Sequence, residues 1–134
     1  MLGRSSVRRG MLLVGASALA LVALAAPATT MAKDGDVVRS GACTGASDWK
    51  LKLGHEDGKI EVEFEVDQNR NGQTWNVRLK QDGNQFWSGQ KTTKAPSGSF
   101  EVRKLASNKA GVHTFVGRAT NPRTGEVCRG TASI

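Results

Sequence analysis

The chain has 134 residues, of which 38% are hydrophobic, and its 19 Lys and Arg outnumber its 12 Asp and Glu to give a formal net charge of +7. Its length suits one domain and excludes two. Three of the arginines lie in the first nine residues, so the remainder carries only +4. That excess is small and dispersed in sequence, which argues against a nucleic-acid partner, because nucleic-acid surfaces show a clustered basic face.

The N-terminal segment has the pattern of a secretory signal peptide. Arg4, Arg8 and Arg9 precede an uncharged apolar run from Met11 to about Ala26. That run of about 15 residues is shorter than the roughly 18–20 needed to span a bilayer as a helix. Small residues suited to cleavage follow in Ala26-Pro27-Ala28 and Thr30-Met31-Ala32. We therefore expect residues 1–32 to be a signal peptide cleaved after Ala32, or alternatively after Ala28, and the product to be secreted, extracellular and not an integral membrane protein.

Two cysteines remain after that cleavage, Cys43 and Cys128, near the two ends of the mature chain. Redox-active pairs are usually close in sequence, as in C-x-x-C, and these cysteines are 85 positions apart. An exported protein meets an oxidising compartment. The sequence therefore predicts a structural disulfide between the first and last strands, worth about 4–5 kcal/mol in the chain-entropy model.

Apolar and polar residues alternate in three segments, Trp49–Leu53, Ile60–Val66 and Trp75–Leu79. This period of two is typical of strands with one buried face. Dipeptides preferred in hairpin turns lie between or after these segments: Asp57-Gly58, Asn71-Gly72 and Asp82-Gly83. Further strands are expected at about 36–43, 84–90, 99–105, 112–120 and 126–134. Eight short strands with regular turns predict an all-β fold, an antiparallel sandwich or barrel.

The turns also predict a register. A turn at Asp57-Gly58 sets Lys52 opposite Glu63 and Lys50 opposite Glu65. A turn at Asn71-Gly72 sets Glu65 opposite Arg78 and Glu63 opposite Lys80. Because acid meets base in both hairpins, the sequence predicts a contiguous three-stranded meander, with its glutamates forming a neutralised and solvated stripe.

One aromatic is expected outside the core. A turn at Asp82-Gly83 sets Phe86 opposite Leu79 on the core face and Trp87 opposite Arg78 on the outer face. Trp87, Arg78 and Lys80 are therefore the candidate binding residues, forming a shallow cationic and aromatic patch for a peptide, a cell-wall polymer or another protein. There are two alternatives: Trp87 only covers the stem of the neighbouring arginine, or a register shift near Ser88-Gly89 buries it.

Metal sites and catalytic motifs are not expected. His55 and His113 have no second ligand at metal-binding spacing, and we expect them to be structural or exposed. The stretch 67–72 matches half of a calcium loop, but Arg78 stands where the bidentate glutamate belongs. No nucleophile motif and no phosphate-binding glycine loop is present. We therefore expect no metal, no cofactor and no enzymatic activity.

Four segments, Trp49–Lys52, Glu61–Asn71, Ala95–Val102 and Ala119–Gly130, resemble a group of small exported proteins from actinobacteria. The resemblance covers essentially all of residues 33–134. It implies a secreted, immunoglobulin-like sandwich of about 7–8 strands and supplies neither an activity nor functional residues. A looser comparison, with neocarzinostatin-type carriers, rests on fold analogy alone.

The expected function is that of a non-enzymatic extracellular module that binds a cell-envelope polymer or a protein. The alternative is a small-molecule carrier, which would need an apolar cleft between the sheets. A third hypothesis, an exported enzyme, would need a convergent set of titratable residues in one pocket.

Overall fold

A computed structural model of the chain describes residue 3 and residues 32–134. Almost all of the predicted signal peptide lies outside the described residues. The described part contains eight strands: β1 (Val37–Ala42), β2 (Asp48–Glu56), β3 (Lys59–Asp67), β4 (Thr74–Gln81), β5 (Asn84–Thr92), β6 (Ser99–Ala106), β7 (Thr114–Thr120) and β8 (Val127–Ser133). Among these residues, no helix has the length and hydrophobicity needed to cross a bilayer.

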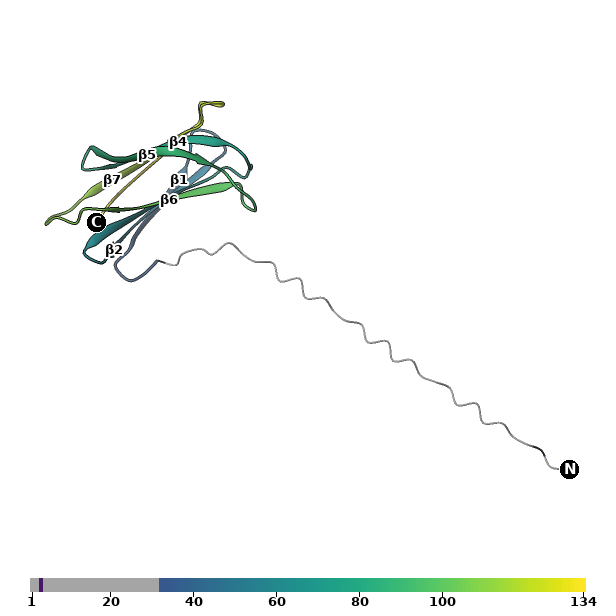
Figure 1. Cartoon of the computed structure of the whole chain (residues 1–134), viewed down its shortest axis with the longest axis horizontal. Helices are drawn as coiled ribbons and strands as arrows, with labels where there is room; N and C mark the ends of the chain where they lie inside the picture. Colours follow the sequence, from purple (N-terminus) through teal and green to yellow (C-terminus); the bar gives the residue numbers. More distant parts are fainter. Residues whose placement is uncertain (1–2, 4–31) are drawn as a thin grey trace.

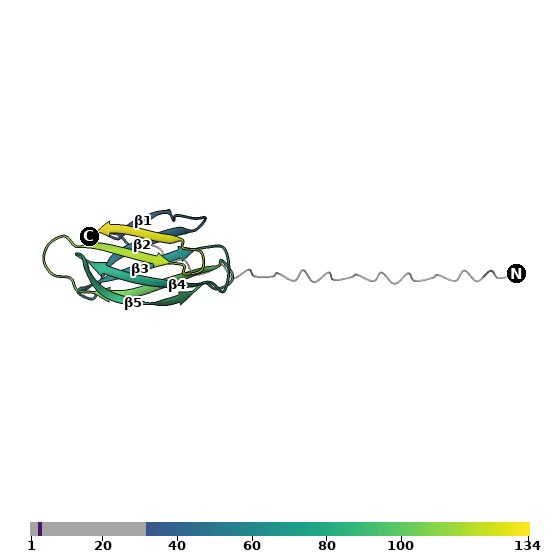
Figure 2. The same ribbon diagram turned by 90° about the horizontal axis from the view of Figure 1, so that it is seen from above.

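The strands form two antiparallel sheets that pack face to face, as Figures 1 and 2 show. The first sheet has the order β1-β2-β3-β6 and the second β5-β4-β7-β8. The predicted antiparallel β-sandwich is confirmed. Its strand order is also compatible with an immunoglobulin-like arrangement, since β2-β3-β6 and β5-β4-β7-β8 can be equated with the strands A-B-E and C′-C-F-G, with β1 added at one edge.

The β2–β3 hairpin has the predicted register. Lys52 faces Glu63 and Lys50 faces Glu65. Asp57 and Gly58 both adopt positive φ, at 47° and 74°. A type I′ turn needs positive φ at both central residues, which is why this dipeptide is favoured there.

The predicted meander is wrong beyond β3. The partner of β3 is β6, so Glu63 faces Arg103 and Glu65 faces Glu101, while β4 lies in the second sheet. The reason is that residues 68–73 form a connection long enough to cross between the sheets. Thr93 fastens this crossing, because its hydroxyl donates to the Arg70 carbonyl at 2.6 Å.

Side chains from both sheets fill the space between them. The largest fully buried ones are Trp75, Phe64 and Phe115. The Trp75 indole N–H donates to Gln68 Oε1 at 3.0 Å. Close packing at Gly117 leaves no room for a side chain, since a Cβ there would lie 2.7 Å from the Phe64 ring. The sandwich interior is therefore packed rather than hollow.

The predicted disulfide between Cys43 and Cys128 is confirmed. Cys43 directly follows β1, and Cys128 lies in β8, so the bond joins the two sheets at the edge where β1 and β8 meet. All eight strands, the hydrophobic core and the disulfide lie within residues 33–134.

Candidate functional site

Trp87 lies on the core side of β5, so its predicted exposure on the outer face is wrong. The register between β4 and β5 shifts, and Trp87 pairs with Leu79 while Phe86 is the extra residue. Such a bulge lets two consecutive side chains point the same way. The Trp87 ring packs against the core, and the Lys104 ammonium of β6 lies 5.1 Å from its centroid. Trp87 therefore closes one edge of the sandwich and does not join a surface patch.

Arg78 and Lys80 do lie on the outer face of the second sheet, where two further arginines join them. Arg78 pairs directly with Arg118 of β7, and Arg118 pairs directly with Arg129 of β8. Lys80 is two residues from Arg78 on the same face, because alternate side chains of a strand share a face. We call Arg78, Lys80, Arg118 and Arg129 the arginine face.

Acidic residues are segregated from the arginine face. Strands β4, β5, β7 and β8 contain no Asp or Glu, whereas β2, β3 and β6 contain seven. Within residues 32–134, none of the four basic side chains makes an ion pair. Like charges directly opposite on neighbouring strands are destabilising. The basic residues are therefore clustered in space, and the expectation of a dispersed charge is wrong.

The arginine face is also hollowed. Its four basic side chains, with Gly83 and Val116, line a depression of about 320 Å³. Guanidinium groups offer forked N–H donors that match carboxylate and phosphate oxygens. Among the described residues, those that line the depression include no carboxylate. The arrangement is thus suited to holding anionic groups.

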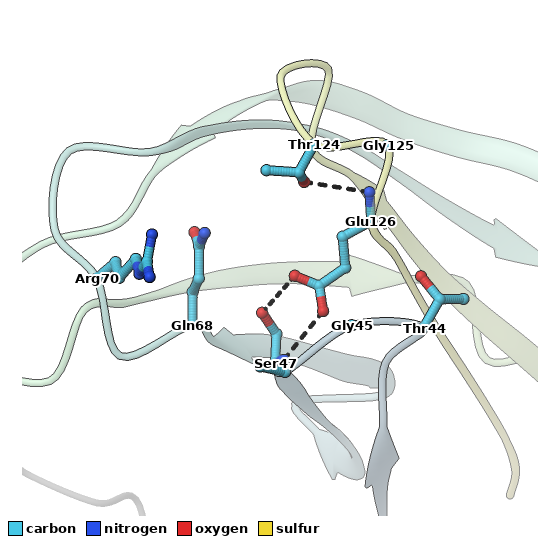
Figure 3. Close-up of a pocket in the computed structure, with 9 residues that line it drawn as sticks. Thr44, Gly45, Ser47, Gln68, Arg70, Thr124, Gly125 and Glu126 are labelled. Atoms are coloured by element: carbon cyan, nitrogen blue, oxygen red, sulfur yellow. Dashed lines mark hydrogen bonds between the residues drawn. The ribbon is translucent and has the colours of Figure 1, made fainter.

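A second pocket, of about 380 Å³, lies at one end of the sandwich between three loops (Figure 3). Its carboxylate belongs to Glu126, which accepts hydrogen bonds from the Ser47 hydroxyl at 2.8 Å and the Ser47 backbone N–H at 3.0 Å. Arg70 and Gln68 lie across the pocket from Glu126. Because Glu126 ties the β1–β2 loop to the β7–β8 loop, we interpret this pocket as a structural clamp.

The glutamate stripe on the outer face of the first sheet is neutralised but not solvated at its centre. Lys52 and Glu63 are each only 6% exposed, and their charged groups are 3.2 Å apart. Asp36 and Arg103 complete the network, each paired with one member of that central pair. Burial raises the pKa of the neighbouring Glu61, and Glu63 adds to this rise while Arg103 opposes it. These titratable groups converge, but they are paired with one another.

His113 is buried and structural. Its Nδ1 donates to the Asp82 carboxylate at 2.7 Å and its Nε2 to the Lys109 carbonyl at 2.7 Å. Both partners are acceptors, so the doubly protonated ring satisfies both. The pKa of His113 is raised, first by its hydrogen bond with Asp82 and next by the one with the Lys109 carbonyl. The pKa of Asp82 is lowered, first by His113 and next by the Thr114 backbone N–H.

His55 is exposed, within 3.5 Å of the Asn108 amide nitrogen. In the stretch 67–72, Asp67 accepts the backbone N–H of Asn69 at 3.0 Å, as in an ordinary turn. No group of three or more His, Cys, Asp or Glu side chains in residues 32–134 is arranged to hold a metal ion.

No protein-family model, no curated protein and no solved structure matches this chain. The function is therefore argued from the geometry of the arginine face.

Proposed function

We propose that residues 33–134 form an exported, non-enzymatic module that binds an anionic polymer of the cell envelope through the arginine face. The observation that carries the proposal is the row Arg78–Arg118–Arg129, three like charges directly opposite one another in a sheet without an acid. Export is supported by the N-terminal sequence pattern, and the Cys43–Cys128 disulfide is compatible with an oxidising compartment.

A polymer suits this face better than a single small anion. Neighbouring strands are about 4.8 Å apart, so three arginines in a row span roughly 10 Å across the sheet. Lys80 lies two residues along the strand from Arg78, or about 7 Å away at 3.4 Å per residue. A chain with repeated anionic groups can contact basic side chains spread over this area.

The carrier alternative has less support. A carrier would need an apolar cleft between the sheets, and Trp75, Phe64 and Phe115 fill that space. The enzyme hypothesis needs reactive groups in one pocket, and the convergent titratable groups around Lys52 and Glu63 neutralise one another. A binding role for the arginine face is therefore the function that the geometry favours.

The test is retention of the oxidised 33–134 domain on immobilised poly(glycerol phosphate), a polyuronate and a neutral glucan. We expect retention on an anionic polymer, weakening with added salt, and none on the glucan. The triple variant R78Q/R118Q/R129Q should lose retention at least tenfold. Its matched control is R39Q/K59Q/K94Q, which removes the same charge from exposed positions elsewhere.

Two results would contradict the proposal. Equal losses in the two triple variants would mean that net charge, and not the arginine face, is responsible. Retention on neither anionic polymer would remove the proposed ligand class. Double-stranded DNA is a further arm, and tighter retention on DNA than on either envelope-type polymer would also overturn the proposal.

A further inference from the structure

The N-terminal end of the domain folds against the outer face of the first sheet. Asp36 lies over Gly54 of β2, where the absence of a side chain makes room for its carboxylate. The Asp36 side chain is only 7% exposed and lies 3.9 Å from the Lys52 ammonium. The chain then turns back, because the Asp36 backbone N–H donates to the Lys33 carbonyl at 3.0 Å. This turn brings the backbone nitrogen of Lys33 to 2.7 Å from Asp36 Oδ2.

The charged groups at this place are unequal in number. A depression on this face is lined by charged residues. With the buried Glu63 beside it, there are four acids, Asp36, Glu56, Glu61 and Glu63, and three bases, Lys33, Lys52 and Arg103. The exposed His55 also lines this depression. Arg103 is also 3.6 Å from Glu101, and Lys59 lies opposite Glu56, so among the described residues five acids face four bases and one negative charge is left over.

We propose that hydrolysis of the Ala32–Lys33 peptide bond creates a terminal ammonium that pairs with Asp36 and completes this charge network. Water supplies a hydroxyl to the Ala32 carbonyl carbon and a hydrogen to the Lys33 nitrogen, and the C–N bond breaks. Ala32 leaves as a carboxylate, and the released amine takes up a proton. The nitrogen that becomes charged already lies within hydrogen-bond distance of its partner.

This inference rests on the export expectation and distinguishes its two cleavage sites. Cleavage after Ala28 would leave the Lys33 nitrogen as a neutral amide and place the ammonium four residues away. Cleavage after Ala32 puts a positive charge on the donor of a hydrogen bond whose acceptor is already a carboxylate, so the contact becomes an ion pair. The structure therefore favours Lys33 as the first residue of the mature protein.

The experiment compares two domains that carry the same total charge, one beginning at Lys33 and one at Thr29, each with and without Asp36→Asn. We expect the Lys33 form to melt about 4 °C or more above the Thr29 form in low salt, and this difference to vanish in the Asp36→Asn pair. The difference should also fade above about pH 8, where an unpaired α-ammonium loses its proton.

Equal melting temperatures, or a difference that survives Asp36→Asn, would overturn the ion pair. The cleavage site is tested separately, by the intact mass of the protein secreted when the full chain is expressed in an exporting bacterium. A mass that begins at Lys33 supports the inference, and one that begins at Thr29 or retains residues 1–32 overturns it. Neither measurement depends on the arginine face, so failure of polymer binding would be distinguishable from failure here.

Discussion

Removing the central charge of the arginine row should stabilise the domain while weakening its binding. Arg118 lies directly opposite both Arg78 and Arg129. If each like-charge pair costs about 0.2–1 kcal/mol, Arg118→Gln relieves about 0.4–2 kcal/mol. A gain near the middle of that range, about 1 kcal/mol, raises the melting temperature of a domain of about 100 residues by about 4–8 °C. Arg78→Gln and Arg129→Gln each relieve one pair and should give about half the gain.

The assay is thermal unfolding followed by circular dichroism, at low and high salt, with Arg118→Lys as the control that keeps the charge. The advantage of Arg118→Gln over Arg118→Lys should shrink at high salt, because the Debye length falls from about 10 Å at 0.1 M to about 3 Å at 1 M. The same variant should bind the anionic polymer more weakly. If Arg118→Gln is no more stable than Arg118→Lys at low salt, the row carries no electrostatic cost and the reasoning fails.

Three further predictions concern stability. Replacing both disulfide cysteines with alanine should lower the free energy of unfolding by about 2–5 kcal/mol, measured with denaturant. Glu126→Ala should lower it by about 1.5–3 kcal/mol in the same assay, since the Ser47 backbone N–H loses its charged acceptor; an unchanged value would refute the clamp. Because the pKa of His113 is raised, its stabilising effect should be full below about pH 6.5 and fade as the pH rises through the folded-state pKa. A melting-temperature profile from pH 5.5 to 8.5 should lose this slope in His113→Gln, and an unaltered slope would assign the effect elsewhere.

Local patterns predicted the elements but not all of their neighbours. The β2–β3 register was predictable because one dipeptide, Asp57-Gly58, sets both the turn and the pairing. The partner of β3 on its other side was not predictable. Alternation tells which face of the sheet a residue occupies, but it does not tell which strand lies next to it. Glu63 would have met a base with either partner, Lys80 in the expected hairpin or Arg103 in the observed one. Glu65 would have met Arg78 in the expected hairpin but meets Glu101 in the observed one, so charge complementarity alone favoured the wrong partner.

The error at Trp87 has a different origin, because a bulge resets the alternation. Phe86 and Trp87 are adjacent large aromatics, and both pack toward the core. Gly89 lies under the Trp87 ring, where a Cβ would come within 2.7 Å of it. This glycine shares a face with Trp87 whichever way the strand is turned, so it could not show which face that is.

The arginine face was only half predictable, because Arg118 and Arg129 come from strands whose inward positions are small residues such as Gly117 and Gly130. Small residues hide the alternation that identified Arg78. Only the pairing of β4 with β7 and β8 brings the three arginines into one row. Stability alone would favour interleaving these charges with the acids that crowd the other sheet. Keeping the arginines apart from the acids lowers the stability of the domain without ligand. A bound polyanion that neutralises the row would offset that loss.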